Sequence, residues 1–178
     1  MFLLFRFLLV SFALSSCSIV NPAAPSHLVS YKLPKGYVEI KSEKSEKGFI
    51  KEFAPAAENP QRWNNMIRYV YQVTESDVET QFKEMADAIA KICVDPFVPR
   101  PFTGTIGGEP ALNGLTACGT NPATQRGEIS QYVMIKDKHG IHSLQKTVRI
   151  NSFKEVEAKG LIKENLKTWN EFFQTIKF

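Results

Sequence analysis

The residue types best suited to chemistry are the cysteines and histidines. Cys93 and Cys118 are far apart in the chain, which does not match the Cys-x-x-Cys spacing of a thioredoxin-type redox pair. Cys118 and His142 could act as nucleophile and base, but no local motif marks them. His139 and His142 could bind zinc, but a zinc site needs three or four ligands, and no other Cys or His is suitably spaced. The sequence therefore predicts no metal and no cofactor.

Common catalytic and nucleotide-binding motifs are absent from the sequence. It has no Gly-x-Ser-x-Gly and no His-Glu-x-x-His, and Gly107-Gly108 lacks the Lys and Ser/Thr of a phosphate-binding loop. Basic residues are interleaved with acidic ones, and the net charge is only +4, so we predict no nucleic-acid surface. We expect a non-catalytic protein, with an envelope hydrolase that uses Cys118 or His142 as an alternative.

The N-terminus is typical of an export signal. Residues 1–16 carry no charge except Arg6, and the apolar run is shorter than the roughly 20 residues of a membrane-spanning helix. It ends in Leu14-Ser15-Ser16-Cys17, which resembles the lipobox of bacterial lipoproteins. The resemblance implies cleavage before Cys17 and acyl chains on Cys17 that hold the protein at a membrane. In that family an Asp after the Cys commonly retains the protein in the inner membrane, so Ser18 implies the outer membrane, facing the periplasm.

Acylation of Cys17 would leave Cys93 and Cys118 as the remaining thiols. Export places both in an oxidising compartment, where two such cysteines usually form a disulfide. We therefore predict a structural disulfide between them.

The mature chain divides into a Pro/Ala-rich tether, residues 17–27, and one domain, residues 28–178. Alternating apolar residues predict strands within 28–53, at 66–73, and in a hairpin formed by 129–136 and 141–151. Apolar stripes at helical spacing predict one helix from about residue 78 to 93 and a second after Gly160. The order of elements indicates an α+β fold with an antiparallel sheet of about five or six strands, two packed helices and one disulfide.

Residues 94–117 are rich in breakers of regular structure. They contain Pro96, Pro99, Pro101 and Pro110, and also four glycines. We predict a long loop whose ends are joined by the disulfide, and loops of this length are often functional. Phe97, Arg100 and Phe102 could face a partner from it. Alternatively, the two phenylalanines pack back onto the core.

Trp63-Asn64-Asn65-Met66-Ile67 and Cys93 resemble a group of uncharacterised exported bacterial proteins, in which a strand that follows a Trp leads to a helix that ends in Cys. The resemblance implies no activity. The order of strands and helices is also similar to the α+β fold of the extrinsic lumenal subunits of photosystems, as an analogy of fold only.

These features predict a lipid-anchored, non-catalytic cell-envelope protein. We expect it to be a structural or accessory component of a membrane-associated assembly, with protein partners in the envelope. A second hypothesis is a small-ligand binder in which the 94–117 segment lies over the mouth of a pocket between sheet and helix.

Overall fold

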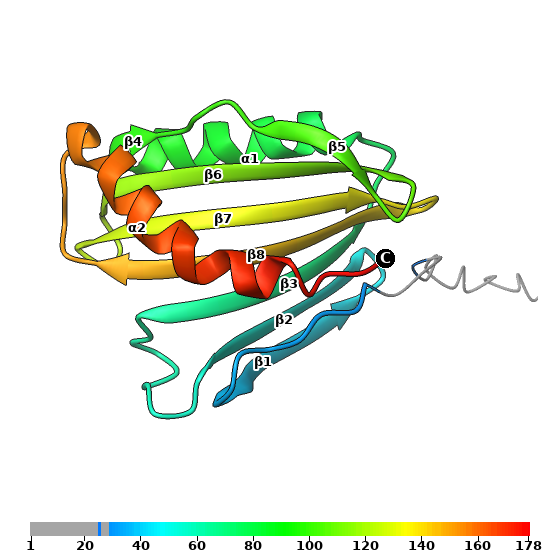
Figure 1. Cartoon of the computed structure of the whole chain (residues 1–178), viewed down its shortest axis with the longest axis horizontal. Helices are drawn as coiled ribbons and strands as arrows, with labels where there is room; N and C mark the ends of the chain where they lie inside the picture. The colour runs from blue at the N-terminus through cyan, green and yellow to red at the C-terminus, as the bar shows by residue number, and fades with distance from the viewer. Residues whose placement is uncertain (1–24, 26–28) are drawn as a thin grey trace, which may run out of the picture.

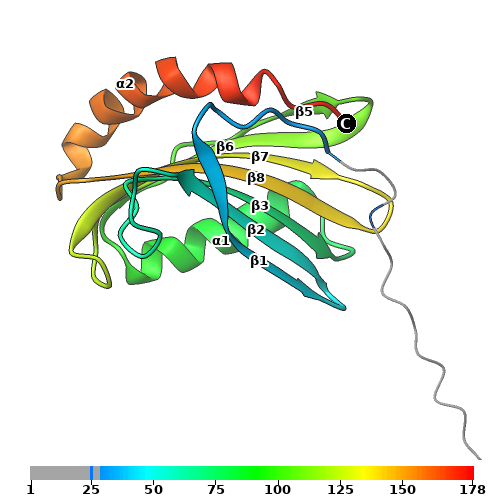
Figure 2. The ribbon, with the colours of Figure 1, turned by 90° about the horizontal axis from the view of Figure 1, so that it is seen from below.

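The structure is a computed structural model that describes residue 25 and residues 29–178. The predicted signal peptide, the lipobox with Cys17, and most of the predicted tether lie outside the described residues. In the described part, one antiparallel sheet lies between two helices, one on each face (Figures 1 and 2). The predicted α+β class is therefore confirmed.

The sheet has eight strands rather than the five or six that we expected. The strands are β1 (Tyr37–Ser45), β2 (Gly48–Pro55), β3 (Asn65–Val73), β4 (Val94–Phe97), β5 (Phe102–Ile106), β6 (Glu109–Asn121), β7 (Arg126–Lys136) and β8 (Gly140–Ile150). Their order is β1-β2-β3-β8-β7-β6, and β4 and β5 both pair with β6. Because β4 pairs with residues 117–120 and β5 with residues 109–113, the two short strands lie end to end along the same edge.

The prediction of a long loop at residues 94–117 is wrong, because this segment contains β4, β5 and most of β6. Pro96 is tolerated because β4 is an edge strand with only one neighbour. Gly107 and Gly108 form the two-residue turn between β5 and β6, and both have positive φ angles, +63° and +90°. The proline and the two glycines therefore lie at a sheet edge and in a tight hairpin turn, and not in a loop.

Helix α1 (Val78–Ile92) begins where we predicted it. The carboxylate of Asp77 accepts a hydrogen bond of 2.7 Å from the backbone N–H of Thr80, which caps the helix. Val78, Phe82 and Ala86 are its buried residues. They pack on an apolar part of the sheet made by Leu112, Tyr132, Met134 and Ile141.

Helix α2 (Glu155–Phe173) starts earlier than the predicted start after Gly160. The Glu157 side chain accepts a hydrogen bond of 2.7 Å from the backbone N–H of Lys154, which closes the first turn ahead of Gly160. Ile162, Trp169 and Phe172 are buried against the face of the sheet opposite α1.

The segment from residue 29 to 33 forms no strand, although we expected strands to begin there. Ser30 instead forms an isolated bridge with Lys177, in which each backbone N–H donates to the other carbonyl at 2.9 Å. The backbone N–H of Lys32 also donates to the hydroxyl of Thr175 at 3.0 Å. The start of the described domain is therefore tied to the C-terminus, a contact that we call the terminal clasp.

Candidate functional site

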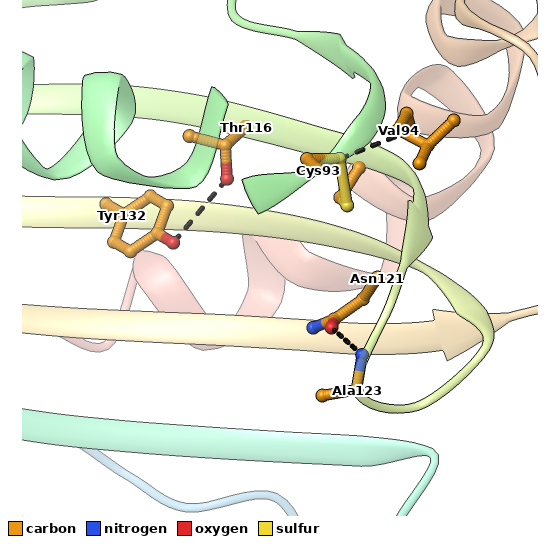
Figure 3. The surroundings of a disulfide bond; sticks show 7 residues. Cys93, Val94, Thr116, Asn121, Ala123 and Tyr132 are labelled. Carbon is orange, nitrogen blue, oxygen red and sulfur yellow. Dashed lines mark hydrogen bonds between the residues drawn. A yellow bond between two sulfur atoms is a disulfide. The ribbon is translucent and has the colours of Figure 1, made fainter. Parts of the chain in front are cut away.

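The two cysteines of the domain form the predicted disulfide (Figure 3). Cys93 directly follows the last residue of α1, and Cys118 lies on β6, with their Cα atoms 5.6 Å apart. The bond ties the C-terminal end of α1 to the sheet. Cys118 is therefore not available as a thiol nucleophile.

His142 does not complete a catalytic pair with Cys118. It lies on β8 opposite Ile135 and Tyr71, whose side chains belong to the α2 face, whereas Cys118 lines a cavity beneath α1. The His142 ring is fully buried, with Nδ1 2.8 Å from the Tyr69 hydroxyl and Nε2 3.2 Å from the carboxylate of Asp137. Both ring nitrogens are engaged, so His142 is part of a buried structural network.

Asp137 also organises the turn between β7 and β8. One of its oxygens accepts hydrogen bonds of 2.7 Å from the backbone N–H groups of His139 and Gly140. Burial, followed by the neighbouring Asp137 charge, raises the pKa of Tyr71 to about 12.

The described residues contain no group of three or more His, Cys, Asp or Glu side chains placed to hold a metal ion.

The three residues predicted to face a partner do not form one surface. Phe97 is half-buried and packs against the apolar cluster beneath α2. Arg100 is exposed, and Phe102 on β5 is 78% exposed. The alternative in which the phenylalanines return to the core therefore describes Phe97, whereas Phe102 points to solvent.

Exposed apolar side chains are concentrated in one segment. Four of the six large hydrophobic residues that are exposed in the described chain lie between positions 92 and 102. They are Ile92, Val94, Val98 and Phe102. We call them, together with β4 and β5, the apolar edge.

The two edges of the sheet differ in their charge. The outer strand β1 carries four charged residues within Glu39–Lys44, and Lys41 forms an ion pair with Glu43 at 3.3 Å. Strand β5, Phe-Thr-Gly-Thr-Ile, carries no charge, and its first four residues are exposed. Edge strands are usually protected by charges against pairing with another chain. The β1 edge has that protection and the β5 edge lacks it.

Apart from the apolar edge, a concave site lies between the sheet and the C-terminal half of α1. It is a cavity of about 250 Å³, and an adjoining hollow of about 190 Å³ shares four of its lining residues. The shared residues are Arg68, Met85, Tyr132 and Gln145. We call the two together the α1 groove. It gives a physical basis to our second hypothesis, although α1 itself covers it in place of a loop.

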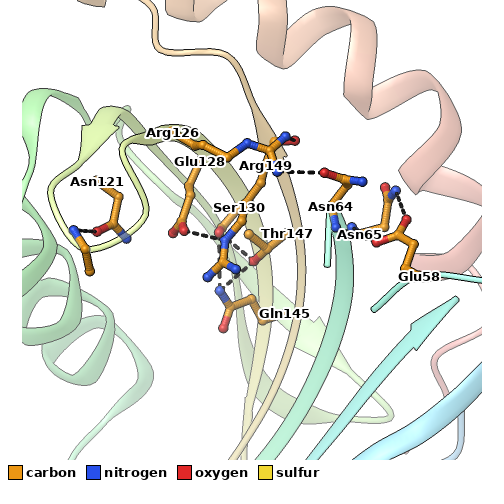
Figure 4. Close-up of polar contacts among 11 residues, drawn as sticks. Glu58, Asn64, Asn65, Asn121, Arg126, Glu128, Ser130, Gln145, Thr147 and Arg149 are labelled. Atoms are coloured by element: carbon orange, nitrogen blue, oxygen red, sulfur yellow. Dashed lines mark hydrogen bonds and ion pairs between the residues drawn. The ribbon is translucent and has the colours of Figure 1, made fainter. Parts of the chain in front are cut away.

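The floor of the α1 groove is polar and hydrogen-bonded (Figure 4). The hydroxyls of Ser130 and Thr147 are 2.7 Å apart. The side-chain amide of Gln145 lies 2.8 Å from the Thr147 hydroxyl and 3.2 Å from the hydroxyls of Ser130 and Tyr132. Burial raises the pKa of Tyr132, so its hydroxyl stays protonated.

Charged residues surround this floor, and each has a partner. Arg68 pairs with Glu52 at 2.7 Å, and Arg149 pairs with Glu128 at 2.7 Å. The guanidinium of Arg149 also lies over the ring of Trp63, 3.4 Å from its centroid. These pairs come from neighbouring strands, and sequence reasoning did not identify them as site residues.

Comparisons with known proteins show the fold but no family. No family model matches the chain, and no curated protein matches it in sequence. The Ran-binding protein Mog1p of Saccharomyces cerevisiae is similar in structure, with 10% identity, a TM-score of 0.56, and coverage of 83% of this chain and 88% of its own. A variant of Mog1 gives 10% identity, a TM-score of 0.55, and coverage of 83% and 89%.

A third solved structure is LpqN, involved in cell-envelope biogenesis in Mycobacterium tuberculosis. It is 12% identical and covers 89% of this chain and 86% of its own, with a TM-score of 0.42. In the part of the chain that the structure describes, no helix is both long and apolar enough to cross a membrane. Of these comparisons, the two Mog1 structures, with TM-scores of 0.55 and 0.56, establish that this arrangement of sheet and helices occurs in other proteins.

Proposed function

We propose that this protein is a lipid-anchored, non-catalytic component of the cell envelope that binds a protein partner through its apolar edge. The apolar leader and the sequence Leu14-Ser15-Ser16-Cys17 support the anchor. The disulfide supports an oxidising compartment. The contrast between the charged β1 edge and the uncharged β5 edge carries the proposal of a partner.

The mode of binding that suits this edge is the addition of a strand. In a hairpin with a two-residue turn, the residues next to the turn exchange both of their hydrogen bonds, and this pattern alternates along the strand. Ile106 is next to the turn. The backbone groups of Thr103 and Thr105 therefore point outward, where an extended segment of a partner can pair with them.

The exposed side chains define the chemistry of this partner. Phe102 and Val98 are 78% and 37% exposed beside the outward face of the strand. Where a Cβ would stand on Gly104, no atom lies within 4 Å, so a partner backbone can approach closely. The partner is expected to present an extended, apolar segment without charge at the contact.

Site-specific cross-linking tests this interface. A photo-crosslinking phenylalanine derivative at position 102 should form a discrete cross-linked product in the intact envelope. The same group at position 38 is the matched control, because Val38 is 45% exposed on β1, the strand at the opposite edge of the sheet. Equal products from both positions would show random encounter and would contradict the proposal.

A pair of proline variants tests whether the contact is made by the strand backbone. Thr105→Pro removes an outward-facing N–H and should strongly reduce the product at position 102. Lys44→Pro is the matched change on β1, since Lys44 occupies the same place relative to its own turn between Ser45 and Gly48. It should leave the product unchanged. Far-UV circular dichroism of both variants checks that the fold is retained.

The anchor requires a separate test. We expect the intact mass of the membrane-bound protein to correspond to cleavage before Cys17 plus acyl chains, in a fraction that separates with the outer membrane. Cys17→Ala should abolish the acylated form and move the processed protein to the soluble fraction. Unchanged processing and membrane retention in Cys17→Ala would contradict the anchor but not the apolar edge.

A further inference from the structure

The two halves of α1 contact the sheet in different ways. Near its N-terminus, Phe82 packs directly on Gly114, where an added Cβ would lie 2.2 Å from the ring. Toward its C-terminus, Met85 and Ile89 are only half-buried, and Ile92 is 64% exposed. Beyond this end the chain is fixed to β6 by the disulfide of Cys93 and by β4, which starts at Val94 and pairs with β6. The α1 groove is the space that this arrangement leaves.

The sheet changes its polarity beneath the helix at the same place. Under the N-terminal half of α1 the sheet presents Leu112 and Met134, which face each other across β6 and β7. Under the C-terminal half the corresponding pair is Thr116 and Ser130, which are 3% and 5% exposed. Buried hydroxyls cost free energy that apolar side chains would not. A departure of this kind from the usual packing is expected at functional sites.

The polar groups of the floor have hydrogen-bonding capacity to spare. The amide nitrogen of Gln145 has two hydrogens, but three hydroxyl oxygens lie within 3.2 Å of it. The hydroxyl of Tyr132 interacts with those of Ser130 and Thr116, and its distance to Thr116, 3.5 Å, is long for a hydrogen bond between oxygens (Figure 3). A hydroxyl or carbonyl of a ligand could therefore accept from Tyr132 and satisfy the floor.

The helix residues above the groove and the charged residues that line it limit the polarity and charge of the ligand further. Met85, Ile89 and Ile92 present only apolar surface to the cavity. Arg68 and Glu128 line it as well, but each is paired at 2.7 Å with a charge of opposite sign. A charged ligand would have to displace one of these partners or lie near a charge of its own sign. The lining therefore favours a neutral ligand. The larger of the two hollows, about 250 Å³, is smaller than the cavities above about 300 Å³ that drug-sized molecules fill.

We propose that the α1 groove binds a small uncharged molecule with a hydroxyl or carbonyl group at one end and an apolar ring or short chain at the other. The polar end lies on Tyr132 and Gln145, and the apolar end lies beneath Met85 and Ile89. The groove shares Ile92 with the apolar edge, but Tyr132, Gln145, Met85 and Ile89 lie outside that edge, so the proposal does not rest on the partner-binding proposal.

Methyl NMR of the methionines can test the proposal with defined probes. The full chain is labelled with ¹³C at the methionine methyl groups and reconstituted in lipid nanodiscs. Met85 lines the groove and Met134 lines the adjoining hollow, whereas Met66 lies in a separate buried cluster with Ala54 and Trp63. We expect 4-ethylphenol to shift the Met85 resonance saturably and to leave that of Met66 in place.

Two analogues of the probe test the polar and the neutral requirement. Ethylbenzene lacks the hydroxyl and should bind about tenfold more weakly, as expected for the loss of one hydrogen bond. The anion 4-ethylbenzoate should produce no saturable shift. Equal affinities for 4-ethylphenol and ethylbenzene, or no shift of Met85 with any of the three probes, would overturn the proposal.

Two isosteric variants assign the effect to one hydroxyl. Tyr132→Phe should abolish the preference for 4-ethylphenol over ethylbenzene. Tyr71→Phe, on the opposite face of the sheet, should keep it. The Met66 resonance reports folding in both variants. A preference that survives Tyr132→Phe, or equal shifts of Met66 and Met85, would also refute the site.

Discussion

At the scale of single residues, Gly114 sets the distance between α1 and the sheet. The ring of Phe82 lies where a side chain on Gly114 would stand, and it packs edge-to-face on Tyr132 with ring centroids 6.0 Å apart. Tyr132 is only 2% exposed and lines the α1 groove. The close contact on one side of Tyr132 therefore fixes the wall of the cavity on its other side.

Gly114→Ala should destabilise the protein by about 1–3 kcal/mol, because the added methyl group forces the Phe82 ring out of its place. The free energy of unfolding in urea measures the loss. Gly104→Ala is the matched control, since no atom lies within 4 Å of the added carbon and its backbone needs no positive φ. A similar loss in both variants would show that the contact with Phe82 is not the cause.

Glu58 organises the loop before β3 (Figure 4). Its carboxylate accepts hydrogen bonds from the backbone N–H of Asn64, from the backbone N–H of Asn65 at 3.1 Å and from the Asn65 side chain at 3.0 Å. Burial raises the pKa of Glu58, but these hydrogen bonds and the charge of Arg126 outweigh it, so the net pKa lies below 4.5. The folded state therefore binds this proton less readily than the unfolded state.

Glu58→Gln should lower the stability at neutral pH and make less difference in acid. The contribution of the carboxylate is complete above the unfolded pKa of 4.5, and it is lost as the pH falls through the lower folded pKa. Urea unfolding of both proteins between pH 7 and pH 3 measures this. A difference in stability that stays constant over the range would show that the charge is not involved.

At the scale of elements, the disulfide holds the half of α1 that packing does not. Ala86 is the last buried residue of the helix, and the remaining turns end at Ile92, which is largely exposed. Cys93 and Cys118 close a loop with a sequence separation of 25. The stability of the C-terminal turns thus depends on this covalent bond together with the pairing of β4, which follows Cys93, to β6.

Replacing both Cys93 and Cys118 by Ser should lower the free energy of unfolding by about 3–4 kcal/mol in the chain-entropy account. Hydrogen exchange should show a larger loss of protection in residues 86–92 than in residues 78–85. Exchange that increases equally along the helix would mean that the bond acts only through the unfolded state.

Local patterns predicted the central elements well. Alternation of Ile67, Tyr69 and Tyr71 indicated β3, and the predicted hairpin corresponds to β7 and β8. The prediction failed at residues 94–117, because Pro and Gly break central strands but are tolerated at an edge and in a tight turn.

The α1 groove could be predicted only in part. The alternation of residues 66–73 indicates that Arg68 lies on the polar side of its strand, and the helical spacing of residues 78–93 includes Met85 in the apolar stripe. The pairing of β3 with β8 and of β8 with β7 brings Arg68, Gln145 and Tyr132 into one row. That order of strands joins distant segments, and no local signal encodes it. The stripe indicates a core position for Met85, whereas this side chain is half-buried in the cavity wall.

At the scale of the whole molecule, the terminal clasp completes one side of the core. Ile176 and Phe178 pack against the apolar cluster that contains Val29 and Tyr69. The Phe178 ring also contacts His142 edge-on at 5.6 Å. The last residues of the chain thus cover the buried histidine network as well as fixing the start of the domain.

Deletion of residues 176–178 should therefore lower the stability by about 2 kcal/mol, as expected for exposing two half-buried apolar side chains and losing the bridge to Ser30. Limited proteolysis should then cut within residues 29–36. Val156→Ser is the control, because its side chain is 87% exposed and should contribute little. A truncated chain as stable and as protease-resistant as the original would show that the clasp is not structural.

The terminal clasp also determines at which end of the sheet the described chain begins. The continuous described chain begins with Val29 and Ser30 beside the C-terminal residues, and Phe178 contacts the turn at Gly107. Cys118 lies about 35 Å farther along β6 at the usual rise of an extended strand. The turn at Gly107 thus lies at the end of β6 where the described chain begins, and the disulfide lies near the opposite end, just before the turn that joins β6 to β7.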